Sequence, residues 1–162
     1  MADGWYVLNA KDAAWYRWCG GGSVMALVEN EASQIGVNLF VLGPGEPMAM
    51  YHWEDAQEDF FVLSGEAVLI ADGEERPLKV WDFVHLEPKV PHTIVGVGSK
   101  PAVILAVGGR TDETREGKLG YPLDAAATKH GAASLEETTD RRVAYSRFER
   151  PEPMTYGGWL DE

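Results

Sequence analysis

The chain has 162 residues, a length that fits one domain with a substantial core. Its formal net charge of -12, with only 14 Lys and Arg residues, argues against a nucleic-acid partner, since phosphate binding needs clustered basic side chains. No apolar run approaches the roughly 20 residues of a membrane-spanning helix, so we expect no membrane partner. Cys19 is the one cysteine, which excludes an internal disulfide; with no secretory signal visible, we expect a cytoplasmic protein.

The N-terminal region, residues 1–35, is dense in aromatic side chains. They are Trp5, Tyr6, Trp15, Tyr16 and Trp18, all ahead of the three glycines at residues 20–22. Large aromatic side chains gain most when they are buried against another surface. We therefore predict N-terminal strands here that pack onto the body of the protein or onto a second subunit.

A series of short apolar segments follows in the middle of the chain. They are rich in Val, Ile, Leu and Phe and cover residues 23–28, 36–42, 48–53, 59–64, 67–71, 74–78, 82–86, 93–97 and 102–107. Such evenly spaced segments are typical of the strands of a sandwich or barrel. Asp72-Gly73, between two of them, is a hairpin-turn signal. The sequence therefore predicts an all-β domain.

The last third of the chain loses this pattern. Residues 123–130 predict a short helix, with Asp124 near its start and Gly131 just past its end. Ser134-Leu135-Glu136-Glu137 has the spacing of a capping box ahead of a second helix near 139–148. We therefore expect a short helical extension at the C-terminus.

Imidazole and carboxylate side chains gather near three of the predicted strands. Alternate residues of a strand share a face, so His52 and Glu54 point to the same side. Glu58 begins the next segment, and His92 begins a later one. If these segments wrap one barrel, the four side chains can converge on its inner wall. Two neutral imidazoles with one or two carboxylates suit one divalent first-row ion, such as Zn, Mn, Fe or Ni.

Apolar residues on the same strand faces would line a pocket beside the ion, and these are Met50, Phe60 and Ile94. Each candidate ligand taken alone has an alternative reading, because a His-x-Glu pair is common on strand surfaces and a histidine after proline is common in loops. Their joint occurrence favours a metal site. His85 alternates with apolar neighbours, so we expect it to face outward or toward a subunit contact, and His130 is most simply a helix-end residue.

The two segments that carry these residues resemble the two sequence motifs of the cupin superfamily. The first family motif is a Gly, His-x-His, three or four residues, Glu, six residues and Gly, and the chain follows it with Gly45, His52-Trp53-Glu54, Glu58 and Gly65. The second commonly reads Gly-Asp-x-Val-x-Ile-Pro-x-Gly-Val-Pro-His. Residues 81–92 follow it in register and match it at Asp82, Val84, Val90, Pro91 and His92.

The chain departs from the family pattern at a few positions. The resemblance implies ligand roles for His52, Glu58 and His92, whereas Glu54 stands where the family usually has its second histidine. This change replaces a neutral ligand with an anionic one, or leaves three ligands if Glu54 turns away. Further departures in the second motif replace a Gly, a Pro and a Gly with Trp81, Glu87 and Lys89.

The resemblance covers about residues 36–108 and implies a double-stranded β-helix, two antiparallel sheets rolled into a conical barrel with the metal inside. On this reading residues 1–162 form a single cupin domain, in which N-terminal strands (1–35) precede the barrel core and a partly helical extension (109–162) follows it. Cupins are often dimers in which N-terminal strands pack across the interface, so we expect a homodimer.

The fold does not choose the function. The first hypothesis is a metal-dependent enzyme on a small organic molecule, of dioxygenase, isomerase or lyase type, with His52, Glu58 and His92 as ligands and Glu54 as a fourth ligand or a general base. No other acid–base pair stands out, so the catalytic residues stay open. The alternative is a non-catalytic module that binds or senses a small carbohydrate or metabolite. A third reading is a structural metal in an assembly component.

Overall fold

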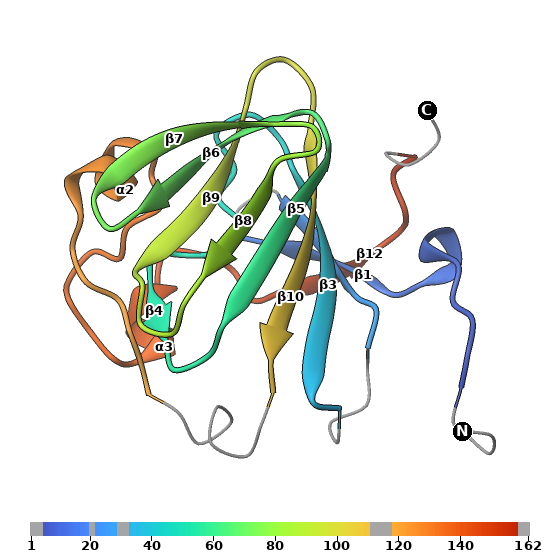
Figure 1. The fold of residues 1–162 in the computed structure, drawn as a ribbon, viewed down its shortest axis with the longest axis horizontal. Helices are drawn as coiled ribbons and strands as arrows, with labels where there is room; N and C mark the ends of the chain where they lie inside the picture. The colour runs from blue at the N-terminus through green and yellow to red at the C-terminus, as the bar shows by residue number, and fades with distance from the viewer. Residues whose placement is uncertain (1–4, 20–21, 29–32, 111–117, 159–162) are drawn as a thin grey trace.

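The computed structural model describes residues 5–19, 22–28, 33–110 and 118–158. Within them, two β-sheets face each other (Figure 1). One is seven-stranded, with the order β12-β1-β2-β3-β10-β5-β8, and the other is three-stranded, with the order β7-β6-β9. The fold is therefore all-β, as the sequence predicts, and has the layout of a double-stranded β-helix.

The strands of the larger sheet are β1 (Trp15–Trp18), β2 (Gly22–Ala26), β3 (Ile35–Leu42), β5 (Glu58–Ser64), β8 (Phe83–Leu86), β10 (Ala102–Gly109) and β12 (Glu152–Met154). Those of the smaller sheet are β6 (Glu66–Ala71), β7 (Glu74–Lys79) and β9 (His92–Val97). A short pair joins β4 (Trp53–Glu54) to β11 (Leu119–Gly120). The helical segments are η1 (Ala10–Asp12), α2 (Ala125–Lys129) and α3 (Arg141–Ala144).

The core of the barrel lies between the two sheets. Alternation along β5 sends Phe60 and Val62 inward, where they meet Ile104 of β10 and residues of the smaller sheet such as Leu69 and Ile94. These side chains form one buried cluster, in which Val62, Ile94 and Ile104 have no exposed surface. Burying such a side chain stabilises the fold by about 1.5–3 kcal/mol. The inner wall of the barrel is therefore apolar except where the candidate ligands begin their strands.

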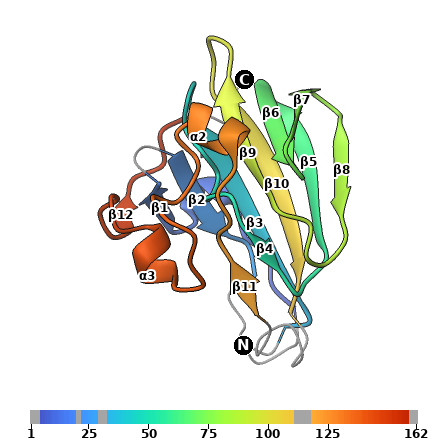
Figure 2. The ribbon, with the colours of Figure 1, turned by 90° about the vertical axis from the view of Figure 1, so that its left-hand side faces the viewer.

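The apolar run of β6 is buried on both of its faces. Its inward residues belong to the barrel core, whereas Val68 and Ile70 pack outward against Ala127 of α2 and against Ala132 and Ala133 after it. The Asp124 side chain caps α2 by accepting a hydrogen bond from the backbone N–H of Ala127. Figure 2 shows α2, β11 and α3 lying along this side of the barrel. The C-terminal extension thus covers the barrel.

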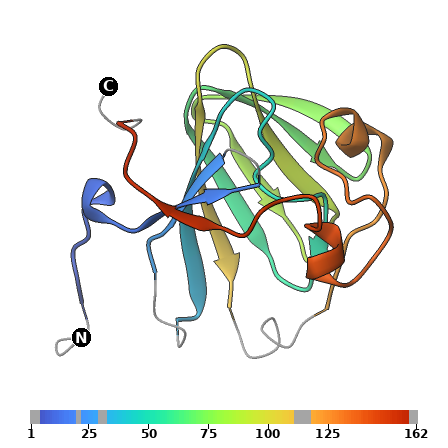
Figure 3. The same cartoon turned by 180° about the vertical axis from the view of Figure 1, so that it is seen from behind.

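The second helix of this extension begins later than its predicted cap. The capping-box residues 134–137 precede α3 without capping it, because Asp140 takes this role and accepts a hydrogen bond from the Arg142 backbone N–H. After α3 the chain returns to β1, where β12 pairs antiparallel with it (Figure 3). The two ends of the described chain therefore meet in one sheet.

The predicted strand at residues 48–53 does not form as a regular strand. Its backbone N–H groups bond to several different segments: that of Met48 donates to Ile94, that of Tyr51 to Ala132, and that of His52 to His92. Only isolated bridges and the two residues of β4 remain. Because the segment is shared among partners, the simple alternation expected along it does not hold.

The aromatic N-terminal region divides into buried and exposed residues. Trp15 is only 1% exposed and packs with Met25, Val41 and Val103 on the outer face of the larger sheet. Trp5 by contrast is 71% exposed. Trp15 is therefore part of the interior of this chain and is not available to a second subunit.

Two departures from the family motif have an unusual backbone conformation. Trp81 has φ of +76° and Lys89 has φ of +73°, in the left-handed region that glycine adopts without strain. A residue with a side chain loses roughly 1–2 kcal/mol there, which accounts for the glycines of the family pattern at these positions. Trp81 stays 70% exposed, with its ring centroid 5.7 Å from that of Phe61.

None of the helices in the described ranges is both long and apolar enough to span a bilayer.

Candidate metal centre

The candidate ligands lie at the starts of strands. His52 directly precedes β4, Glu58 is the first residue of β5, and His92 is the first residue of β9. Two backbone hydrogen bonds of 3.1 and 2.8 Å join His52 and His92 in an antiparallel bridge. The bridge sets the two rings side by side, with centroids 5.1 Å apart. Both imidazoles are therefore positioned by backbone pairing between two segments that lie far apart in the sequence.

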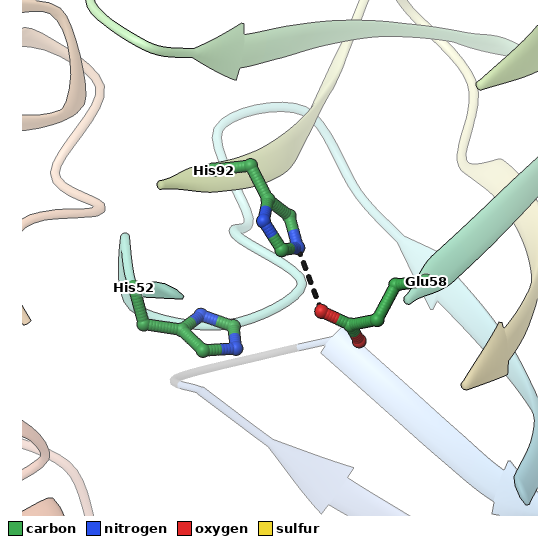
Figure 4. Close-up of side chains that lie close together, drawn as sticks. All are labelled: His52, Glu58 and His92. Atoms are coloured by element: carbon green, nitrogen blue, oxygen red, sulfur yellow. Dashed lines mark ion pairs between the residues drawn. The ribbon is translucent and has the colours of Figure 1, made fainter. Parts of the chain in front are cut away.

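Three of the predicted ligands converge on one point. Figure 4 shows the side chains of His52, Glu58 and His92 directed toward one another. Each offers a donor atom, and these atoms all lie within 4.8 Å of one another. Two atoms that share one first-row ion at about 2.1 Å are separated by roughly 3–4 Å. The group can therefore hold one ion after small side-chain adjustments.

Backbone carbonyls hold both rings in the tautomer that a metal needs. Nδ1–H of His52 donates to the Met50 carbonyl at 2.7 Å, and Nδ1–H of His92 donates to the Val90 carbonyl at 2.9 Å. With Nδ1 protonated, the lone pair of each neutral ring lies on Nε2. The carbonyls thus orient the two rings, as hydrogen-bond acceptors do for metal-bound histidines in known metal sites.

The pKa values of the group reflect burial and mutual charge. Burial, and then the charge of His92, lowers the pKa of His52 to about 4, so this ring is neutral at neutral pH. Burial also acts to lower the pKa of His92, but the adjacent Glu58 carboxylate outweighs it and the pKa is raised. For Glu58, burial acts to raise the pKa, yet His92 beside it lowers the value overall.

Two buried atoms lack the hydrogen bonds that burial demands. Glu58 Oε2 and His92 Nε2 lie 3.1 Å apart, but neither has a hydrogen-bond partner of good geometry among the described residues. With no ion bound, a proton on His92 Nε2 makes this contact an ion pair, in keeping with the raised pKa of His92; a divalent cation between the two atoms takes the place of that proton. A bound divalent ion supplies that cation, so the residues present fit a metal.

Glu54 lies beside this group without joining it. It is on β4 and lines the same cavity, but it is not among the donors that converge. Burial, followed by the negative charge of Glu58, raises the pKa of Glu54 to about 7. The carboxyl group therefore titrates near neutral pH when no ion is bound, and a bound cation would lower this pKa. Whether it binds the ion stays a prediction.

A cavity of about 650 Å³ adjoins the cluster. From the barrel it is lined by His52, Glu58, Phe60 and Asn38, and by Arg110 just after β10. This volume lies within the roughly 300–1,000 Å³ of small-molecule sites. The candidate ion would therefore face a space large enough for a small organic molecule.

The C-terminal extension closes another side of this cavity with Tyr121, Arg141 and Tyr145. The sequence reasoning missed these residues. A helix of four residues presents too short a pattern for its inward face to be recognised, and an arginine after a capping aspartate is common on surfaces.

The predicted pocket-lining residues have different positions. Phe60 is at the cavity wall, whereas Ile94 belongs to the barrel core and Met50 packs with Tyr121 and Ala144 in a separate buried cluster. Met50 lies in the irregular segment before β4, where alternation fails. Instead, the neighbouring Met48 and Ala49 line the cavity.

The other two histidines lie outside the cluster. His85 is on β8 and pairs through Nδ1 with the Asp59 carboxylate at 2.7 Å, with nearly half of its side chain exposed. His130 follows α2 and pairs with Glu75 at 3.0 Å. Both positions agree with the outward and helix-end readings from the sequence.

Comparison with known proteins identifies the domain formed by the barrel strands. Residues 38–108 match the family model of the cupin domain. The chain contains a cupin domain. The match covers the barrel strands from β3 to β10, including both segments that contribute to the metal centre.

Solved structures agree with this family. The cupin domain resembles a sugar phosphate isomerase of the cupin superfamily from Silicibacter pomeroyi, with 28% identity and a TM-score of 0.58 over 67% of this chain and 74% of that one. A proposed sugar phosphate isomerase from Acidithiobacillus ferrooxidans has 25% identity and a TM-score of 0.52, over 60% and 64% of the two chains.

A relative among curated proteins is an uncharacterized protein of Methanocaldococcus jannaschii. It is 28% identical to this cupin over 61 residues, which are 38% of this chain. The match spans 49%, about half, of the relative's own length.

Proposed function

We propose that this cupin is a metal-dependent isomerase that acts on a small sugar-like compound. The observation that carries the proposal is the group of His52, Glu58 and His92 beside a cavity of about 650 Å³ with both polar and apolar walls. Isomerases that interconvert hydroxy-carbonyl compounds need a cation near the carbonyl oxygen and a group that moves a proton. Both elements are available here in one space.

Each residue has a distinct role in this proposal. His52, Glu58 and His92 hold the divalent ion, which when bound acts as a Lewis acid on a substrate oxygen. Glu54 lines the same cavity and takes or returns a proton at the adjacent carbon. Phe60 forms an apolar part of the wall and limits the access of water to the reacting atoms.

Two similar proteins support the isomerase type. The structures from Silicibacter pomeroyi and Acidithiobacillus ferrooxidans are both described as sugar phosphate isomerases, the second as a proposed one. Identities of 28% and 25% leave room for a different substrate, so the kind of sugar is not carried over.

The direct test begins with protein purified without a metal-affinity tag. We expect elemental analysis to find about one divalent first-row ion per chain, and we expect isomerisation of one or more members of an aldose–ketose panel. Dialysis against a chelator should abolish turnover, and adding the ion back should restore it. Bound metal and sugar without turnover on any panel member would contradict the enzyme and support the sensing module instead.

We also propose that the protein is a homodimer in the cytoplasm. An aromatic patch on the larger sheet, formed by Phe61, Trp81 and Phe83, leaves Trp81 and Phe83 at 70% and 62% exposure. Such patches are characteristic of contact surfaces. Sedimentation equilibrium should give twice the chain mass, and replacing Trp81 and Phe83 by serine should give the monomer mass. A monomer at every concentration of the unchanged protein would refute this proposal.

A further inference from the structure

The C-terminal extension brings a cationic side chain to the cavity beside the metal centre. Arg141 is the first residue of α3, and it lines the cavity together with Tyr121, which follows β11. The barrel alone, residues 38–108 of the family match, contains neither residue. The cavity therefore has a part that belongs to the family domain and a part that is added by this chain.

Local contacts position Arg141. Its side chain lines the cavity beside Tyr121, a residue that is only 2% exposed. Asp140 caps α3, and Ala144 on the same helix is buried against Tyr121. α3 thus fixes the backbone of Arg141 beside a buried tyrosine, while the residue as a whole stays exposed at the edge of the cavity.

The charges around the cavity favour an anion once the ion is bound. The ionisable lining side chains are two glutamates, two arginines, two tyrosines and His52. With Glu54 counted as ionised, the charges of Glu54 and Glu58 balance those of Arg110 and Arg141, so a divalent ion leaves an excess of at least two positive charges. This local excess contrasts with the net charge of -12 of the whole chain. A cavity with such a field concentrates small anions.

The two arginines are not equivalent. The Arg110 guanidinium lies against the backbone of β3, where a Cβ on Gly36 would come within 2.5 Å of its Nε. Arg110 also donates to the carbonyl of Val28 at 3.5 Å. Arg141 lines the cavity together with Tyr121 and Tyr145, and its planar guanidinium is suited to binding two oxygens of one oxyanion.

The geometry points to Arg141 as the residue that binds an oxyanion group of the substrate at the cavity edge, while the reacting end of the same molecule meets the metal centre. The substrate class is then a small polyhydroxy compound with a phosphate or carboxylate group. This inference rests on the proposed function for the reacting end, but anion binding is measured without turnover.

The test is calorimetric titration of inorganic phosphate and of acetate into the metal-loaded protein at low ionic strength. Arg141→Gln should raise the dissociation constant for the preferred anion about tenfold or more, since a charge-assisted, paired hydrogen bond is lost. Arg142→Gln is the matched control: it removes the same charge from the next residue, which is exposed and does not line the cavity. It should change the constant by less than about twofold. Arg141→Lys should give an intermediate value, because it keeps the charge and loses the planar fork.

Tighter binding of phosphate assigns a phosphate ester to the substrate, and tighter binding of acetate assigns a carboxylate. Equal losses of anion affinity in the Arg141→Gln and Arg142→Gln variants would mean that the anion is attracted by the overall surface charge, and would overturn the inference. It is also overturned if neither anion binds, or if Arg141→Gln binds the anions as the unchanged protein does. If the protein isomerises a sugar but these binding results are negative, only this inference is refuted. If anion binding depends on Arg141 but no sugar is turned over, only the proposed function is refuted.

Discussion

His92→Ala protein should retain almost none of the metal that the unchanged protein carries. The substitution removes one of three converging donors and leaves Glu58 buried without the group that it faces at 3.1 Å. Substitution of residues that only hydrogen-bond the metal ligands already costs roughly 10–100-fold in metal affinity. Loss of a ligand itself should therefore cost at least about 100-fold. Elemental analysis after gel filtration and a competition titration with a chelator measure the effect.

The design separates ligand loss from misfolding. His92 is only 2% exposed, so the alanine variant also creates a cavity, and His92→Gln serves as a second variant of more similar volume. His85→Ala is the matched control, because His85 lies on the exposed side of β8 and pairs with Asp59. Circular dichroism should show the same strand content in all three. Full metal content in both His92 variants would mean that the site is wrongly assigned.

Glu54→Gln should keep the metal and lose about 10²–10⁴-fold in turnover, which is the usual contribution of general acid–base catalysis. The amide occupies nearly the same volume and cannot exchange a proton. Glu54 lines the cavity but stands outside the group of converging donors, so the ion should stay bound. Initial rates on the sugar-like substrate and metal content on the same preparation are the two measurements.

The outcomes assign Glu54 to one of its two predicted roles. Loss of metal together with activity would make Glu54 a fourth ligand, and Glu54→His, which restores the usual family residue, should then bind an ion with a different metal preference. Unchanged turnover would remove Glu54 from the chemistry. Glu87→Gln, an exposed change outside the cavity, is the charge-matched control.

The barrel strands were readable from the sequence because their side-chain pattern and their turns agree. Phe60 and Val62 alternate along β5 and are both buried. Asp72-Gly73 joins β6 to β7, and both residues have positive φ, as the hairpin signal requires. Local propensity and burial thus favour the same structure along these strands.

Prediction of the site was less complete where the chain leaves regular pairing. His52, Glu58 and His92 come together because each begins or adjoins a paired strand. Alternation assigned Met50 and Glu54 to the face of His52; Glu54 does line the same cavity, whereas Met50 does not, because the segment before β4 is irregular. Its backbone partners lie up to 95 residues away, as in the bond from Met50 to the Tyr145 hydroxyl, and no local pattern encodes such contacts.

Two parts of the chain form the cavity walls, and this division affects how its ligand selectivity could change. The candidate metal ligands belong to the barrel, whereas Tyr121 and Arg141 belong to the C-terminal extension that covers it. We expect substitutions of Arg141, at the cavity edge, to change which molecules bind while the three candidate ligands stay in place. Grafting residues 118–158 onto a related barrel is therefore a route to a cavity with a different ligand selectivity.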